Sequence, residues 1–107
     1  MTPALEPAIA RFFEATNRGD SNGFLDAFAA DGVLEDWGRV FTGREQIAGW
    51  NERENIGVRS HIEPGAVTRE DDAYRVEVEV TGGGYNGGGA MTFTLREGKI
   101  ARMVITG

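Results

Sequence analysis

The period of the hydrophobic pattern changes along the chain, and this change constrains the fold more than any other feature. In residues 5–16 apolar side chains return every three or four positions, which is the spacing of one face of an α-helix. In residues 74–80 and 91–95 apolar and polar residues alternate, which is typical of strands with one buried face. We therefore expect an α+β domain, with helices from the first half packed on one face of an antiparallel sheet.

Three helices are predicted, over residues 5–18, 20–30 and 43–55. Gly19 and the pair Asp31-Gly32 are expected to end the first two, because glycine accepts the left-handed backbone that often closes a helix. Asp20 or Ser21 would cap the second helix. Thr42 and Glu45 match the T-x-x-E pattern of a capping box, in which both side chains bind free amides at a helix start.

A short strand is expected between the second and third helices. Side chains alternate between the two faces of a strand, so Val33, Glu35 and Trp37 should share one face, and Leu34 and Asp36 the other. Glu35 and Asp36 then point apart and cannot form a carboxylate pair that shares a proton.

The strands of the second half are separated by clear turn signals. Pro64-Gly65 interrupts a strand that begins near Val58, as proline does at a sheet edge or a bulge. Glu97-Gly98 is a good two-residue hairpin turn. The last strand, residues 100–105, is apolar on both faces, which predicts a central strand with a pocket on one side and a second copy of the chain on the other. We expect a homodimer through this outer face.

The segment TGGGYNGGG, residues 81–89, opens into a strand rather than a helix. Glycine-rich loops that bind phosphate lead directly into a helix N-terminus, so a flexible hairpin tip is the simpler interpretation. Tyr85 within it could alternatively fold over a pocket mouth as a lid.

Composition excludes several classes of protein. The 107 residues predict one domain, 1–107, and the absence of cysteine rules out disulfides, a thiolate nucleophile and a cysteine zinc site. A single histidine makes a transition-metal site a poor prospect, and no metal or cofactor is expected. The net charge of −6 disfavours nucleic acid. The N-terminal segment lacks a basic lead-in and no apolar run reaches membrane-span length, so we expect a cytoplasmic protein without a membrane partner.

The run NRGDSNGFLDAFAADGVLEDWGRVFTGREQIAGW, together with FTLREGKIARMVI, resembles the nuclear-transport-factor-2-like superfamily, especially its SnoaL-like and ketosteroid-isomerase-like members. The resemblance implies a cone-shaped, curved antiparallel sheet with three N-terminal helices closing an apolar pocket, a cystatin-like α+β barrel. It also implies a homodimer.

The resemblance aligns Asp36 with the aspartate base of ketosteroid isomerases. Their oxyanion-hole tyrosine falls on Phe12 and their late aspartate on Met91 or Ala90, and none of these side chains donates a hydrogen bond. This argues against ketosteroid isomerase activity. The positions where SnoaL-like cyclases are expected to carry an acid/base aspartate are also apolar.

Asp36 is the predicted catalytic residue, because a carboxylate removed from water among aromatic side chains can serve as a base near neutral pH. Alternatively it caps a turn or faces solvent. His61 is either a surface imidazole or, if its face lines the cone, a second catalytic group beside Asp36. The candidate ligand-binding residues, which are also candidates for the core, are Phe12, Phe28, Trp37, Phe41, Trp50, Tyr85, Met91 and Phe93.

Three functions remain open. The first is proton transfer at carbon next to a carbonyl, in isomerisation, cyclisation or dehydration of a small hydrophobic compound, with Asn51, His61 or Tyr85 in place of the missing oxyanion donors. The second is binding of a small hydrophobic molecule without chemistry. The third is a homodimeric interaction domain.

Overall fold

The computed structural model describes residues 5–107. The first four residues, part of the segment in which no secretion signal is expected, lie outside the described residues. The elements are α1 (Pro7–Arg18), α2 (Ser21–Asp26), β1 (Phe28–Asp36), β2 (Arg39–Thr42), α3 (Gly43–Glu54), the 3-10 turn η1 (Ile56–Val58), β3 (His61–Glu70), β4 (Ala73–Thr81), β5 (Gly87–Arg96) and β6 (Lys99–Thr106). The α+β class is confirmed.

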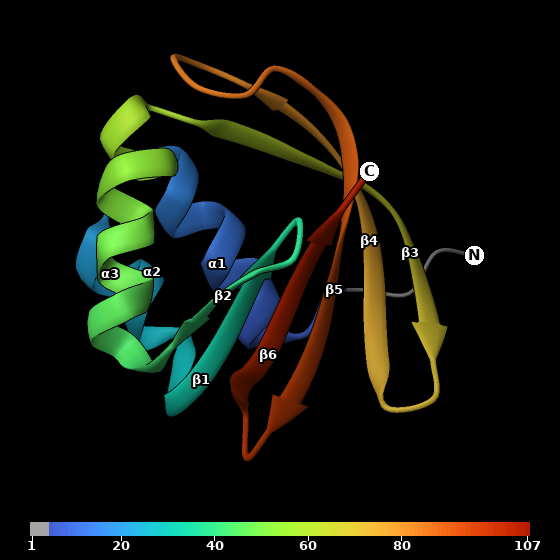
Figure 1. Cartoon of the computed structure of the whole chain (residues 1–107). Helices are drawn as coiled ribbons and strands as arrows, with labels where there is room; N and C mark the ends of the chain where they lie inside the picture. Colours follow the sequence, from blue (N-terminus) through green and yellow to red (C-terminus); the bar gives the residue numbers. More distant parts are fainter. Residues whose placement is uncertain (1–4) are drawn as a thin grey trace.

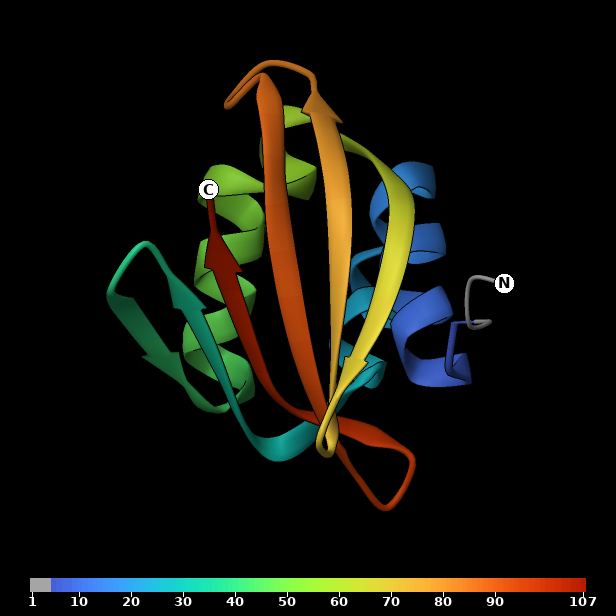
Figure 2. The ribbon, with the colours of Figure 1, turned by 90° about the vertical axis from the view of Figure 1, so that its right-hand side faces the viewer.

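The six strands form one curved sheet in the order β2-β1-β6-β5-β4-β3, in which only the β1 and β6 pair is parallel. All three helices cover the concave face of this sheet, and the long strands arch over them (Figure 1). Figure 2 shows the convex face, with the helices behind it and the hairpin of β1 and β2 at one edge. The concave face is therefore the side on which both the core and the candidate site lie.

An aromatic cluster centred on Phe12 joins the helices to the sheet. The ring of Phe12 lies 5.2–6.2 Å, between centroids, from those of Phe13, Phe24, Phe28 and Phe93. Three of these four contacts are edge-to-face, the arrangement that aromatic quadrupoles favour. Because Phe12, Phe24, Phe28 and Phe93 are each 0% exposed, the cluster fixes α1, α2, β1 and β5 relative to one another.

The second helix is shorter than its apolar run predicts. It is capped by Asp20, which accepts from the Gly23 amide at 3.0 Å, and it ends at Asp26. The expectation that Phe28–Ala30 belongs to this helix is wrong, because Phe28 already pairs with Ile100 in β6. Gly32 is not a helix cap but a tight point inside β1, where an added Cβ would lie 3.0 Å from the Ala29 carbonyl oxygen.

β1 does not simply end after Asp36 but turns back as a hairpin that the sequence analysis missed. Trp37 and Gly38 both have positive φ, 51° and 85°, as the two central residues of a tight hairpin turn do. Trp37 therefore lies in the turn, not on the face of Val33 and Glu35. The predicted alternation of the strand itself holds, since Leu34 and Asp36 are buried on the concave side.

The predicted capping box of α3 names the wrong residue as the partner of Thr42. Thr42 is the N-cap, but its side chain makes no capping hydrogen bond. Its backbone amide instead donates to Oε1 of Gln46 at 2.8 Å, so Gln46 takes the part expected of Glu45.

β3 begins at His61 rather than near Val58, because Ile56–Val58 form a 3-10 turn that closes with Arg59 at a positive φ of 56°. The strand lies at the sheet edge, and its register shifts between Pro64 and Val67, as the proline predicts. The turn at Glu97-Gly98 is also confirmed, with positive φ at both residues.

β6 is central, as predicted, but its apolar residues do not simply alternate between two faces. A register shift against β5 beyond Thr94 places Ile100 in the core together with Met103, while Ile105 lines the concave side. The outward side of β6 keeps the half-buried Val104 and the Arg102 side chain, which pairs with Glu35 at 2.5 Å. The outer face is thus less apolar than its sequence indicates.

Phe12→Tyr tests whether this position belongs to the closed core, since the resemblance places a hydroxyl-bearing residue there. The added hydroxyl would be buried without a partner, which costs about 1–3 kcal/mol of unfolding free energy. Urea denaturation should show this loss, whereas the same change at half-buried Phe41 should cost little. If Phe12→Tyr were as stable as the wild type, the edge of the Phe12 ring would have to face a solvated pocket instead of the closed core.

Candidate functional site

A pocket of about 310 Å³ opens on the concave side of the sheet. Its walls come from the ends of β1 and β6, the C-terminal part of α3, the segment from η1 to β3, and the inner face of β4 and β5. The wall on the sheet side is largely apolar and includes Ile62, Val78, Val80, Met91 and Ile105. The volume is at the lower end of the range for small-molecule sites, which fits a ligand of one or two rings.

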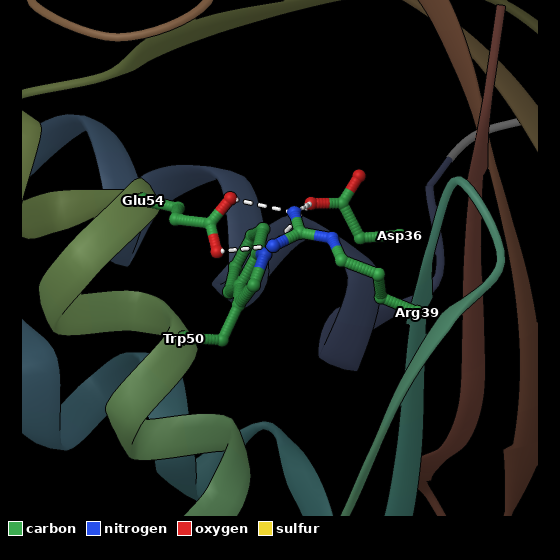
Figure 3. Close-up of polar contacts among 4 residues, drawn as sticks. All are labelled: Asp36, Arg39, Trp50 and Glu54. Carbon is green, nitrogen blue, oxygen red and sulfur yellow. Dashed lines mark hydrogen bonds and ion pairs between the residues drawn. The ribbon is translucent and has the colours of Figure 1, made fainter.

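Asp36 is a largely buried carboxylate that lines this pocket. It is only 9% exposed, and its Oδ2 accepts two hydrogen bonds, from Trp50 Nε1 at 3.0 Å and from Arg39 Nη2 at 2.6 Å. No donor within residues 5–107 reaches its other oxygen, Oδ1, which points away from the guanidinium in Figure 3. The carboxylate therefore has one oxygen that is anchored and one that is free to contact a ligand.

Arg39 links this carboxylate to a second one. Its Nη1 and Nη2 donate to the two oxygens of Glu54 at 2.8 and 2.6 Å, a bidentate pair across the pocket edge (Figure 3). The hydrogen bond from Arg39 lowers the pKa of Glu54, and the same bond raises the pKa of Arg39. Both residues are ionised at neutral pH, so Arg39 and Glu54 form an ion pair at the pocket.

The direction of the Trp50 N–H is set by packing. Trp50 is 4% exposed and its ring stacks on Phe24, with centroids 6.2 Å apart and an angle of 23° between the planes. Phe24 in turn belongs to the aromatic cluster of the core. The indole ring therefore packs as a core side chain, while its N–H donates a hydrogen bond to Asp36.

The rim of the pocket carries exposed aromatic side chains and the glycine-rich loop. Trp37 and Tyr85 are 65% and 57% exposed. The Tyr85 hydroxyl donates to the Gly88 carbonyl at 2.8 Å, and the side chain of Asn86 donates to and accepts from the backbone of Gly82. The loop is therefore a hydrogen-bonded turn at the pocket edge, and a lid movement of Tyr85 stays a prediction.

Half of the expected ligand-binding residues line the pocket with Asp36, namely Trp37, Trp50, Tyr85 and Met91. The other half do not. Phe12, Phe28 and Phe93 form the aromatic core, and Phe41 lies under the Arg39 guanidinium, 5.7 Å from its ring centroid.

The structure places His61 outside the pocket. Its side chain is 55% exposed and lies 3.1 Å from Glu63, on the convex side of β3. Asn51 also does not face the pocket, because it is 1% exposed and its Oδ1 accepts from the side chain of Asn55. Neither residue is placed to stand in for a missing oxyanion donor.

Sequence analysis missed Arg39, Glu54 and Ser60 as pocket residues. Arg39 follows Asp36 by three positions, a spacing that would have shown the pairing had the two-residue turn been recognised. Glu54 gave no signal in the sequence, since the helical pattern of α3 does not reveal a partner that lies on β2. No cluster of three or more His, Cys, Asp or Glu side chains in residues 5–107 could hold a metal ion. None of the helices in that range is long and apolar enough to cross a membrane.

Acid should abolish the stabilising effect of the pair between Arg39 and Glu54. The pKa of Glu54 lies below its ordinary value of 4.5 in the folded protein, so the pair contributes stability above that value and loses it as the pH falls through the folded pKa. Urea unfolding of Glu54→Gln should therefore show a deficit against the wild type at pH 7 that shrinks at pH 3, while exposed Glu52→Gln shows none. An equal deficit at both pH values would contradict the ion pair.

Several solved structures have a similar fold. A candidate polyketide cyclase from Sinorhizobium meliloti is 27% identical, with 95% of each chain covered and a TM-score of 0.83. A protein with a ketosteroid isomerase-like fold from Catenulispora acidiphila, crystallised with trimethylamine, is 25% identical over 100% of this chain and 87% of its own, with a TM-score of 0.80.

A Δ5-3-ketosteroid isomerase from a Mycobacterium species shares the fold at 17% identity, with a TM-score of 0.80 over 94% of this chain and 89% of its own. A comparison with curated protein sequences found no match. The family model for the SnoaL-like domain matches residues 9–103. The resemblance predicted from the sequence is thereby confirmed, and the chain belongs to the SnoaL-like domain family.

Proposed function

We propose that this protein catalyses proton transfer at a carbon next to a carbonyl group in a small hydrophobic compound, with Asp36 as the general base. The reaction class is isomerisation, cyclisation or dehydration. This proposal rests on the two oxygens of one carboxylate. Oδ2 accepts hydrogen bonds from Trp50 and Arg39, while Oδ1 has no donor and Asp36 lines a largely apolar pocket.

The proton transfer takes place between the base and the substrate. Oδ1 of Asp36 takes a proton from the carbon next to the carbonyl, and the electron pair of the broken C–H bond moves to form an enolate. In an isomerisation Asp36 then returns the proton to a different carbon of the same molecule. The fixed position of the base supplies much of the effect, because a proton acceptor held in place avoids the entropy cost of a collision in water.

The chemistry of the base also limits which substrates are suitable. A carboxylate removes a proton most readily from a C–H bond that is already acidic. We therefore propose substrates whose C–H bond is acidified by the carbonyl and by a second unsaturated group. The methylene groups between two carbonyls of a polyketide have this property, which fits the similarity to the candidate polyketide cyclase of Sinorhizobium meliloti.

The alternative function is binding of a small hydrophobic molecule without chemistry. The same ion pair favours it, since a carboxylate that is neutralised by an arginine can serve as a fixed polar contact alone. The apolar wall of the pocket suits both functions.

Deuterium exchange into 2-tetralone in heavy water tests the catalytic proposal. This ketone is a fused apolar bicycle with a methylene between its carbonyl and an aromatic ring. The wild type should accelerate exchange at that carbon, and Asp36→Asn should lose about 10²–10⁴-fold of the acceleration. Glu35→Gln is the matched control, because Glu35 is the next residue but pairs with Arg102 on the opposite face of the sheet.

The melting temperature with 2-tetralone separates the two functions. A ligand at a hundred times its dissociation constant adds about 2.7 kcal/mol to stability whether or not it reacts. Stabilisation without accelerated exchange would favour the binding module, and exchange that persists in Asp36→Asn would contradict Asp36 as the base.

We also propose that the chain forms a homodimer through the convex face of the sheet, as the resemblance implies. Sedimentation should then show a dimer at micromolar concentration, and Val104→Glu, on that face and outside the pocket, should yield a monomer. A monomeric wild type would contradict the homodimer proposal and would leave the proposed function of the pocket unchanged.

A further inference from the structure

Ser60 is a buried hydroxyl residue in the pocket wall that the mechanism above does not use. It is 6% exposed and lies between η1 and β3, where its backbone amide donates to the Asn55 carbonyl at 3.0 Å. The glycine-rich loop packs directly against it, since a Cβ on Gly82 would lie 3.0 Å from the Ser60 Cα and 2.5 Å from the Arg59 carbonyl oxygen. This close approach gives the first glycine of the loop a role, because only a residue without a side chain fits there.

The Ser60 hydroxyl has no hydrogen-bond partner among residues 5–107. Within that range, every side-chain nitrogen or oxygen that is sealed from solvent has a partner, so the Ser60 oxygen is not sealed and must reach open space. The residue is otherwise buried, and the open space beside it is the pocket.

The other buried donors of the pocket are already engaged. The Trp50 N–H binds Asp36, and the amide of Asn55 donates to Thr16 Oγ1 and Asn51 Oδ1. The Tyr85 hydroxyl at the rim donates to a backbone carbonyl. Ser60 is therefore a buried side chain with a hydrogen bond still to give.

We propose that Ser60 is the oxyanion donor of the site, whose hydroxyl binds the carbonyl oxygen of the substrate while Asp36 takes the proton from the neighbouring carbon. This inference rests on the proposed function. It supplies the donor that Phe12 and Met91, at the positions of the ketosteroid isomerase donors, cannot provide.

The step balances without a cofactor. The C–H bond breaks, its proton forms an O–H bond with Asp36 Oδ1, and its electron pair forms the carbon–carbon double bond of the enolate. The π electrons of the carbonyl move to its oxygen, which becomes negative. The hydrogen bond from Ser60 strengthens as this charge develops, and the Ser60 hydroxyl keeps its proton. The hydrogen bond therefore lowers the barrier more than it tightens substrate binding.

The infrared band of bound 2-tetralone, isotope-labelled at its carbonyl carbon, tests the proposal directly. A hydrogen bond to the carbonyl oxygen should move the band to lower frequency in the wild type, and Ser60→Ala should move it back toward its position in an apolar solvent. Ser60→Ala should also slow deuterium exchange by about a hundredfold. Thr68→Val, which removes an exposed hydroxyl from β3 outside the pocket, is the control and should change neither.

The outcomes are separable. A wild-type band at the apolar position would overturn the Ser60 proposal even if Ser60→Ala failed to fold. A band and an exchange rate that both survive in Ser60→Ala would overturn it while leaving Asp36 as the base. A band that shifts in the wild type and returns in Ser60→Ala, with no exchange in either, would support Ser60 as a carbonyl-binding residue and contradict the proposed function.

Discussion

The hydrogen bond from the Trp50 indole to Asp36 is the interaction on which the site depends. It joins the end of β1 to the middle of α3, and it is made by a side chain that also stacks on the aromatic core. Since Trp50 cannot turn without disturbing Phe24, the position of Oδ2 is set by hydrophobic packing rather than by a flexible polar contact. The core thus orients the carboxylate, and the free oxygen faces the pocket as a consequence.

Charge balance at this end of the pocket follows from the hairpin of β1 and β2. The two-residue turn brings Arg39 back beside Asp36, and the guanidinium then reaches Glu54 on the last turn of α3. The guanidinium therefore holds two carboxylates that come from different elements, Asp36 on β1 and Glu54 on α3. Its hydrogen bond to Asp36 goes to Oδ2, so Oδ1 keeps its place in the pocket.

Much of the fold could be predicted from periodicity, because strands and helices with one buried face leave a regular pattern. The face of Asp36 was predicted correctly, since it needs only the alternation within one strand. Arg39 and Glu54 could not be found in this way, because their pairing depends on a hairpin and on a helix packed across it. The broken alternation of β6 could not be predicted, because its register shift against β5 leaves no pattern in the sequence. Ser60 was missed because only the folded structure shows whether a hydroxyl has a hydrogen-bond partner.

A crystal structure with 2-tetralone bound would test the central claim most directly. The fused rings should lie against the apolar wall of β4 and β5, with the carbon next to the carbonyl at Asp36 Oδ1 and with Oδ2 still bound to Trp50 and Arg39. The ketone bound elsewhere, or an Asp36 side chain turned away from Trp50 toward solvent, would contradict the assignment of this carboxylate as the functional centre.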